Sequence, residues 1–242
     1  MRLETGKEAP GAGAGCGEGA QEVPLHRVEM FLRQLAHDVR NDLNAMDLLI
    51  SYAEDAGASA LAAQTLDQLH GAVRYGSKRI QRLARAFQSP VPDCIPYPVD
   101  LLFEDLRDRI GMERPELAAR LRWQFEGRSA RPALDPVLVL EALTELLENA
   151  AAFSPAEETV LVRACAHEGG GLWQVSQHCM TPPRDPSQWG VRPLESARRA
   201  HYGLGLFRVR RILRVHGARL DFVHDPVAGV LRTEVFFPEA RL

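Results

Sequence analysis

The 242-residue sequence predicts an α+β protein, in which an antiparallel helical hairpin is followed by an α/β sandwich. Two observations support this fold class. Residues 23–89 carry an apolar repeat of heptad type, broken once by a short glycine-containing stretch. Residues 100–242 alternate helical patterns with strand patterns of period two. Residues 90–99 between them are rich in proline, which cannot continue a helix, so we interpret them as a linker between two domains.

The composition argues against several classes of function. The 29 Lys and Arg against 32 Asp and Glu leave a net charge of −3, which gives no general attraction to nucleic acids or anionic membranes. No apolar run approaches the roughly 18 residues of a membrane span. The four cysteines form no C-x-x-C pair, so a reduced, cytoplasmic setting is expected. Residues 1–22 include a glycine- and alanine-rich stretch and predict a flexible tail.

The heptad repeat predicts two long helices that pack against each other in antiparallel order. One slot of the repeat is exceptional in each helix, with Asp42 in the first and Gly76 in the second. A turn near residues 57–59 places these two at nearly the same level, so the polar side chain meets a residue without one. Because a single hairpin leaves half of each seam exposed, we expect a homodimer that closes a four-helix bundle. The seam positions are Val28, Leu32, Leu35, Val39, Met46, Leu49 and Ala53, then Leu66, Leu69, Val73, Ile80, Leu83 and Phe87.

The second part of the chain predicts a mixed sheet layered against helices. Its longest helix begins after Asp135, which can cap the first turn, and Pro136 is favoured directly after a cap. A later helix ends at Gly217. Helices are expected at 99–110, 135–153 and 203–217, and strands at 120–127, 159–167, 171–178, 218–225 and 229–238.

The stretch LAHDVRNDLNAMDLL, residues 35–49, places three polar side chains of chemical interest on the first helix. A neutral imidazole is a nucleophile, and histidine is substantially neutral near pH 7, so His37 can attack phosphorus. The neighbouring carboxylate of Asp38 can hold the other ring N–H and fix the tautomer. Asn41 lies one turn later on the same face, where its amide can orient a water. The alternative is a surface histidine with an acidic neighbour by chance.

The order and the residues of these segments resemble the core of a bacterial histidine kinase over residues 28–238. The residues from His37 to Leu43 are similar to the family's H-box, although Asp42 stands where the family has proline. ELLENAAAFSP, from Glu145, is similar to the N-box, and GLGLFRVRRILRVHG is similar to the second glycine box with its helix. The resemblance implies a dimerisation and phospho-acceptor hairpin followed by an ATPase domain of the GHKL type, with His37 as the acceptor.

The nucleotide site that the resemblance implies combines the N-box with the glycine box. In the family, an asparagine, here Asn149, holds the magnesium of ATP, and in the wider superfamily a glutamate, here Glu145, activates a water or a hydroxyl. The glycines, here Gly203 and Gly205, present N–H groups to phosphates. From the residues alone, Glu145 and Asn149 can equally lie on an exposed helix face. The two glycines can equally serve close packing of their helix.

A further box of the family is substituted in this sequence. The D-x-G-x-G motif aligns with WQVSQHCMTPP, which puts Gln177 at the aspartate that binds adenine, and Cys179 and Thr181 at the glycines. Side chains in place of glycine narrow the backbone and block close approach of a ligand. His201 likewise replaces the first glycine of the second box. No cofactor is therefore firmly expected, because the resemblance implies ATP with Mg²⁺ and these substitutions argue against both.

The intact acceptor helix beside a damaged nucleotide pocket favours a histidine phosphotransferase. We expect His37 to relay a phosphoryl group to or from receiver aspartates of response regulators, with Lys78, Arg79 and Arg82 of the second helix near the phosphoryl oxygens. Two alternatives stay open, an ATP-dependent histidine autokinase and phosphatase, and a non-catalytic dimeric adaptor that binds response regulators. The expected partners are receiver domains and a second copy of the chain, with no nucleic acid and no membrane.

Overall fold

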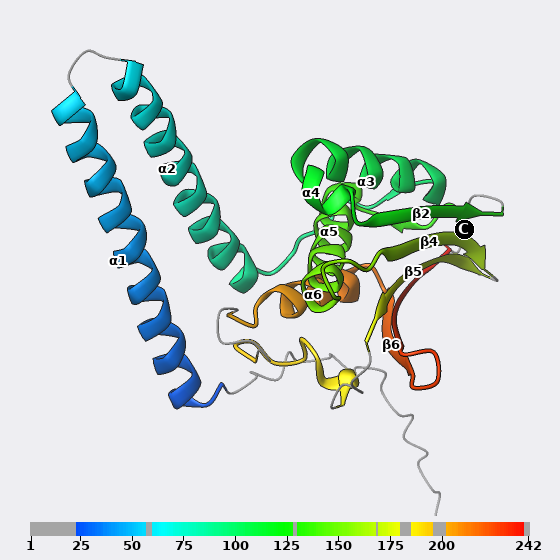
Figure 1. Ribbon diagram of the computed structural model, residues 1–242. Helices are drawn as coiled ribbons and strands as arrows, with labels where there is room; N and C mark the ends of the chain where they lie inside the picture. The colour runs from blue at the N-terminus through cyan, green and yellow to red at the C-terminus, as the bar shows by residue number, and fades with distance from the viewer. Residues whose placement is uncertain are drawn as a thin grey trace, which may run out of the picture.

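The computed structural model shows two parts that stand side by side, a long helical hairpin and an α/β layer (Figure 1). The predicted α+β fold class is confirmed. The predicted tail, residues 1–22, lies outside the residues that the structure describes. The described residues are 23–56, 60–127, 130–167, 169–179, 185–195 and 202–239, without the side chains of 54–56, 60–63, 78, 79 and 82.

Two helices, α1 (Leu25–Ala56) and α2 (Ala60–Phe87), form the hairpin. Gly76 is buried against α1, where a Cβ would lie 3.7 Å from Met46 Cε and 3.9 Å from Asp42 Oδ2. The predicted pairing of Asp42 with Gly76 is therefore confirmed. The predicted centre of the turn lies outside the described residues. No helix in the described ranges is both long enough and apolar enough to cross a membrane.

The α/β layer contains a five-stranded mixed sheet in the order β2-β4-β5-β7-β6. Strands β2 and β4 are parallel because a helical crossover connects them, and the other neighbours are antiparallel. All five predicted strands are present. Their bounds are Leu121–Glu126 for β2, Val160–His167 for β4, Gly170–His178 for β5, Arg219–Asp225 for β6 and Val230–Pro238 for β7.

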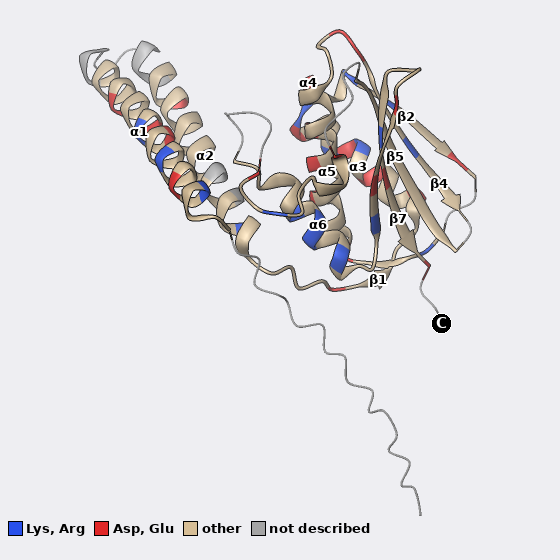
Figure 2. Ribbon diagram, turned by 90° about the horizontal axis from the view of Figure 1, so that it is seen from below, with Lys and Arg blue, Asp and Glu red and all other residues tan. Residues whose placement is uncertain are grey.

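Helices cover one face of this sheet and leave the other face open (Figures 1 and 2). The strand alternation explains the layering. In β4, Val160 and Val162 are fully buried under the helices, whereas Arg163, the residue after Val162, faces the open side and pairs with Glu126. The helices of the layer are α3 (Val99–Glu113), α4 (Pro115–Ala118), α5 (Pro136–Phe153) and α6 (Gly205–Val215), with a short 3-10 turn, η1, at Pro186–Gln188.

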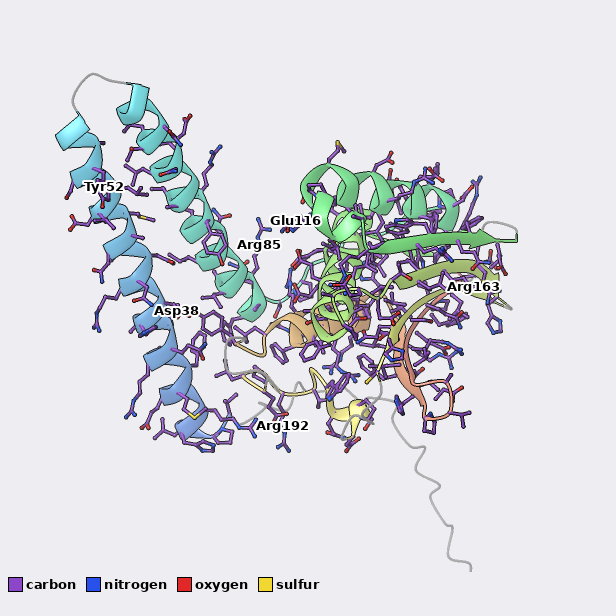
Figure 3. The ribbon with its side chains drawn as sticks, viewed as in Figure 1. Asp38, Tyr52, Arg85, Glu116, Arg163 and Arg192 are labelled. Atoms are coloured by element: carbon purple, nitrogen blue, oxygen red, sulfur yellow. The ribbon has the colours of Figure 1, made fainter. Side chains whose placement is uncertain are left out.

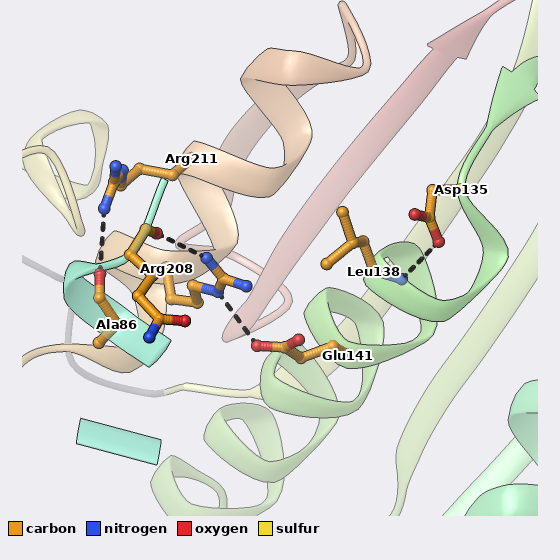
Figure 4. A network of polar contacts seen from close by, with 7 residues as sticks. Ala86, Asp135, Leu138, Glu141, Arg208 and Arg211 are labelled. Atoms are coloured by element: carbon orange, nitrogen blue, oxygen red, sulfur yellow. Dashed lines mark hydrogen bonds and ion pairs between the residues drawn. The ribbon is translucent and has the colours of Figure 1, made fainter. Parts of the chain in front are cut away.

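Helix α5, which carries the N-box, begins where the sequence predicts. Asp135 Oδ1 accepts hydrogen bonds from the N–H groups of Val137 at 2.9 Å and Leu138 at 3.1 Å (Figure 4). Asp135 Oδ2 accepts one from the N–H of Asp93 at 3.0 Å. Burial raises the pKa of the Asp135 carboxyl, but these N–H groups outweigh burial and hold the pKa below its usual range.

The predicted linker is tied to the α/β layer. Strand β1 (Ile95–Pro96) pairs antiparallel with β3 (Ala133–Leu134), and Val99 is fully buried at the start of α3. The sequence pattern does not indicate this pairing, because proline is uncommon within strands and is tolerated mainly at sheet edges. The hairpin therefore enters the α/β layer through a paired segment.

Candidate functional site

His37 lies on α1 on the side away from α2. Asp42 faces Gly76 of α2 and lies five positions after His37, so the two side chains point about 140° apart around the helix axis, at ~100° per residue. The His37 side chain is 69% exposed. A partner molecule can therefore reach the imidazole without opening the hairpin.

Asp38 and Asn41 approach the same ring nitrogen of His37. Asp38 Oδ1 lies 3.4 Å, and Asn41 Nδ2 lies 3.3 Å, from His37 Nδ1. Nδ1 can serve only one of them, since it donates to the carboxylate when it carries the proton and accepts from the amide when it does not. The structure thus brings together the three residues that the sequence indicates, and neither neighbour engages Nε2. The side chains of Lys78, Arg79 and Arg82, expected nearby, lie outside the described ones.

Tyr202 reaches this group from the α/β layer. Its hydroxyl donates to Asp38 Oδ2 at 2.5 Å, and its ring packs edge-on against Phe31 of α1 at a centroid distance of 5.4 Å. Figure 3 shows Asp38 on the side of α1 that faces the α/β layer. Sequence reasoning missed Tyr202 because it is 164 positions from Asp38 and no motif links the two residues.

The candidate phosphate-binding residues lie where α5 meets α6. Glu145 of α5 packs directly on Gly205, the first residue of α6, where a Cβ would lie 1.9 Å from Glu145 Oε1 and 2.7 Å from its Cδ. A Cβ here would force the end of the Glu145 side chain to move, so glycine permits this close contact. The negative charge of Glu145 also lies beside the positive end of the α6 dipole, which stabilises anions.

The other two residues of this set are also enclosed by the protein. Gly203 has a φ of +67°, and a Cβ there would lie 2.4 Å from the carbonyl oxygen of Glu195, so both its conformation and its surroundings require glycine. Asn149 is half-buried, and its Nδ2 is buried without a hydrogen-bond partner among the described residues. The exposed helix face that the sequence allowed for Glu145 and Asn149 is wrong, since both are half-buried.

The strand that aligns with the adenine box continues as regular sheet. Gln177 is 6% exposed and lies on the helix-covered face of β5. The N–H of Cys179 donates to the carbonyl of Gly229 at 2.7 Å, and His224 Nε2 lies 2.9 Å from the carbonyl of Cys179. The N–H and carbonyl of Cys179, directly after β5, are therefore already paired with Gly229 and the His224 side chain. Thr181 and His201 lie outside the described residues.

No protein-family model matches the sequence, and no curated protein matches it either. Solved structures do match. The Acinetobacter baumannii histidine kinase AdeS superposes with a TM-score of 0.59 and 11% identity over 85% of this chain and 98% of its own. Histidine kinase ThkA, in complex with response regulator protein TrrA, gives a TM-score of 0.61 and 13% identity over 89% of this chain and 63% of its own. Full-length ShkA in complex with AMPPNP gives 0.59 and 17% over 88% of this chain and 47% of its own.

The chain has the fold of a histidine kinase core. The match covers both the hairpin and the α/β layer, as the share of the chain that superposes on AdeS shows. Identities of 11% to 17% are too low to carry an activity from these structures to this chain.

Within this histidine kinase fold, two contacts of the described residues oppose a phosphate at the glycines. The carboxylate of Glu145 lies against Gly205 at the start of α6, and its negative charge repels a phosphate there. The backbone of Glu195 fills the open side of Gly203.

Proposed function

We propose that the chain is a histidine phosphotransferase of two-component signalling, which relays a phosphoryl group through His37 to or from receiver aspartates of response regulators. Residues 23–89 form its dimerisation and phospho-acceptor domain, and residues 100–242 form an ATPase-like domain that does not use ATP. One observation carries the proposal: His37 is open to a partner, while the Glu145 carboxylate packs on Gly205 at the start of α6, where its negative charge opposes a nucleotide phosphate.

The chemistry follows from the two neighbours of the imidazole. When Nδ1 of His37 carries the proton and faces Asp38, the Nε2 lone pair can attack the phosphorus of a receiver acyl phosphate. The bond between phosphorus and the receiver carboxylate breaks, and the aspartate leaves as a carboxylate. The ring becomes positively charged in this step, and the Asp38 carboxylate stabilises that charge. Asn41, one turn later, is the residue proposed to orient a water for hydrolysis.

A response regulator is the proposed partner because the acceptor face is exposed and one structure of this fold, ThkA, is a complex with a response regulator protein. A receiver domain must bring its phosphorylated aspartate within reach of Nε2, so it must contact α1 around His37. The net charge of −3 gives no reason to expect nucleic acid at this face.

A second copy of the chain is the proposed partner of the hairpin. A groove of about 500 Å³ runs along α1, and apolar side chains on its rim are open, with Leu32 54% and Leu43 58% exposed. On α2, Ile80 is 56% exposed. Exposed apolar faces of this kind mark association surfaces. The groove is lined by Leu32, Leu35, Ala36, Val39, Arg40, Leu43 and Asn44.

A phosphoryl transfer assay tests the relay. The full chain is incubated with a panel of receiver domains that carry labelled phosphate and, separately, with labelled ATP and Mg²⁺, and acid-labile label on the chain is measured. We expect label from one or more receivers and none from ATP. His37→Gln should lose all label, whereas His26→Gln, another exposed histidine on α1, should keep it. Label from ATP alone would favour the autokinase, and no label from any receiver would favour the adaptor.

Light scattering tests the dimer. We expect twice the chain mass at micromolar concentration, and one chain mass for Leu43→Glu, because a charge in the groove opposes burial. Leu48→Glu is the matched control, since Leu48 is 57% exposed but lies outside the groove lining, and it should stay dimeric. A single chain mass for the unmodified protein would contradict the dimer.

A further inference from the structure

Two described residues before α6, Glu195 and Tyr202, contact one face of the acceptor helix α1. Tyr202 donates to Asp38 at 2.5 Å, and its ring packs against Phe31. Arg27, one turn before Phe31, forms an ion pair with Glu195. These residues of α1 lie four and seven positions apart, so they form one stripe that faces the α/β layer.

Tyr202 is also anchored by the residues that follow it in the chain. The positive φ of Gly203 and its contact with Glu195 fix the turn that follows Tyr202. Helix α6, which begins two residues later, is fastened to the end of α2: Arg208 Nη1 donates to Gln88 O at 2.9 Å, and Arg211 Nη1 donates to Ala86 O at 3.2 Å (Figure 4). Tyr202 is therefore positioned against α1 by contacts with both helices of the hairpin.

The two oxygens of Asp38 have different partners. Oδ2 receives the Tyr202 hydroxyl at 2.5 Å, the length of a strong charge-assisted hydrogen bond, whereas Oδ1 lies 3.4 Å from His37 Nδ1. Fixing one carboxylate oxygen restricts rotation of the group and keeps the other directed at the ring. Asp38 competes with Asn41, 3.3 Å from the same nitrogen, so the orientation of Asp38 decides which tautomer of His37 is favoured.

We propose that Tyr202 is a positioning residue for His37: by holding Asp38, it favours the tautomer with the proton on Nδ1 and the lone pair on Nε2. The ATPase-like domain then serves the relay by orienting the acceptor. This inference rests on the proposed function, because it assumes that Nε2 is the nucleophile. Tyr202 touches neither the phosphoryl group nor the reacting nitrogen.

A small phosphoryl donor tests the inference without a receiver domain. Nε2 of His37 attacks the phosphorus of phosphoramidate, whose nitrogen is protonated in the zwitterion. The P–N bond breaks, ammonia leaves with its electron pair, and the proton stays on Nδ1 facing Asp38. For Tyr202→Phe, we expect about a tenfold slower formation of phosphohistidine, the usual range for loss of an orienting partner. Tyr52 is an exposed tyrosine on α1, the helix that carries His37 (Figure 3), and Tyr52→Phe should react at the unmodified rate.

Two further readouts separate positioning from a general structural effect. In a double-mutant cycle, Tyr202→Phe should have no effect once Asp38→Asn is present, because the tyrosine acts through the carboxylate. The ¹⁵N shifts of the His37 ring should show the Nδ1–H tautomer in the unmodified chain and a larger Nε2–H share in Tyr202→Phe.

An unmodified rate for Tyr202→Phe with an unchanged tautomer would overturn the inference, and so would independent effects of the two substitutions. A different result would show that the proposed phosphotransferase function is wrong. In that case the unmodified chain forms no phosphohistidine from any donor, while the tautomer measurement still reports whether Tyr202 orients His37.

Discussion

The acceptor face of α1 and the junction of α5 with α6 carry the two sets of residues that the histidine kinase resemblance indicates, and they are built in opposite ways. On α1, His37 is open and its neighbours approach one ring nitrogen only. At the junction, Glu145 and the backbone of Glu195 occupy the space beside the two glycines. The difference teaches that a glycine in such a box need not face a ligand, because here it is explained by the protein's own packing.

The largest effect is expected from Gly205→Ala. The added Cβ would meet Glu145 Oε1 at 1.9 Å, so the variant should lose about 1–3 kcal/mol of unfolding free energy, as overpacked sites do. In a Glu145→Ala background the same substitution should cost far less, since its obstacle is gone. Urea unfolding of the four chains measures this coupling. Equal costs in both backgrounds would show that Glu145 does not explain the glycine.

The helix cap of α5 gives the next effect. Asp135→Ala should cost about 1 kcal/mol at pH 7, the usual value of an N-cap. The pKa of Asp135 is lowered in the folded chain, so its contribution is full above the unfolded pKa and is lost as the pH falls through the folded value. The difference between the two chains in unfolding experiments should therefore shrink below about pH 4.

The effect of Asp135→Ala should be confined to the α/β layer and should not reach the acceptor face of α1. The ¹⁵N shifts of His37 on α1 should not change in Asp135→Ala, since Asp135 lies in the α/β layer. Asp108→Ala, an exposed carboxylate on α3, is the matched control and should leave stability nearly unchanged. A pH-independent effect of Asp135→Ala would contradict the assignment of the cap to the charged carboxylate.

The smallest effect is expected where the two regions are joined. Figure 2 shows basic residues, coloured blue on the ribbon, along α6. Arg211 of this helix donates to Ala86 O and, at 2.8 Å, to Ser89 Oγ at the end of α2. Cations at a helix C-terminus contribute about 0.3–1 kcal/mol. Arg211→Ala should therefore lower stability by this amount and speed protease cleavage after α2. Arg214→Ala, exposed in the last turn of α6 and away from the end of α2, should leave cleavage after α2 unchanged, and equal cleavage of both variants would contradict the role of Arg211.

The sequence predicts those features that depend on local patterns. The cap at Asp135, the strands and the level of Asp42 with Gly76 all follow from periodicity or from short motifs, and the structure confirms them. The contact of Tyr202 with Asp38 could not be predicted, because it depends on how the α/β layer docks on the hairpin.

The residues of the candidate phosphate site also depend on a contact that the sequence does not reveal. The spacing of Glu145 and Asn149 is visible in the sequence, but the packing of Glu145 on Gly205 is a contact between two helices that are far apart in the chain. Short motifs describe which residues share a helix face. They do not show what occupies the space in front of that face.

The contrast between the two regions is tested most directly by calorimetric titration of the full chain with ATP and Mg²⁺, which measures whether the junction of α5 with α6 binds a nucleotide. Because the Glu145 carboxylate packs on Gly205 and the Glu195 backbone packs on Gly203, we predict no saturable binding up to millimolar nucleotide. Binding with a micromolar dissociation constant would contradict this account and would favour the ATP-dependent autokinase.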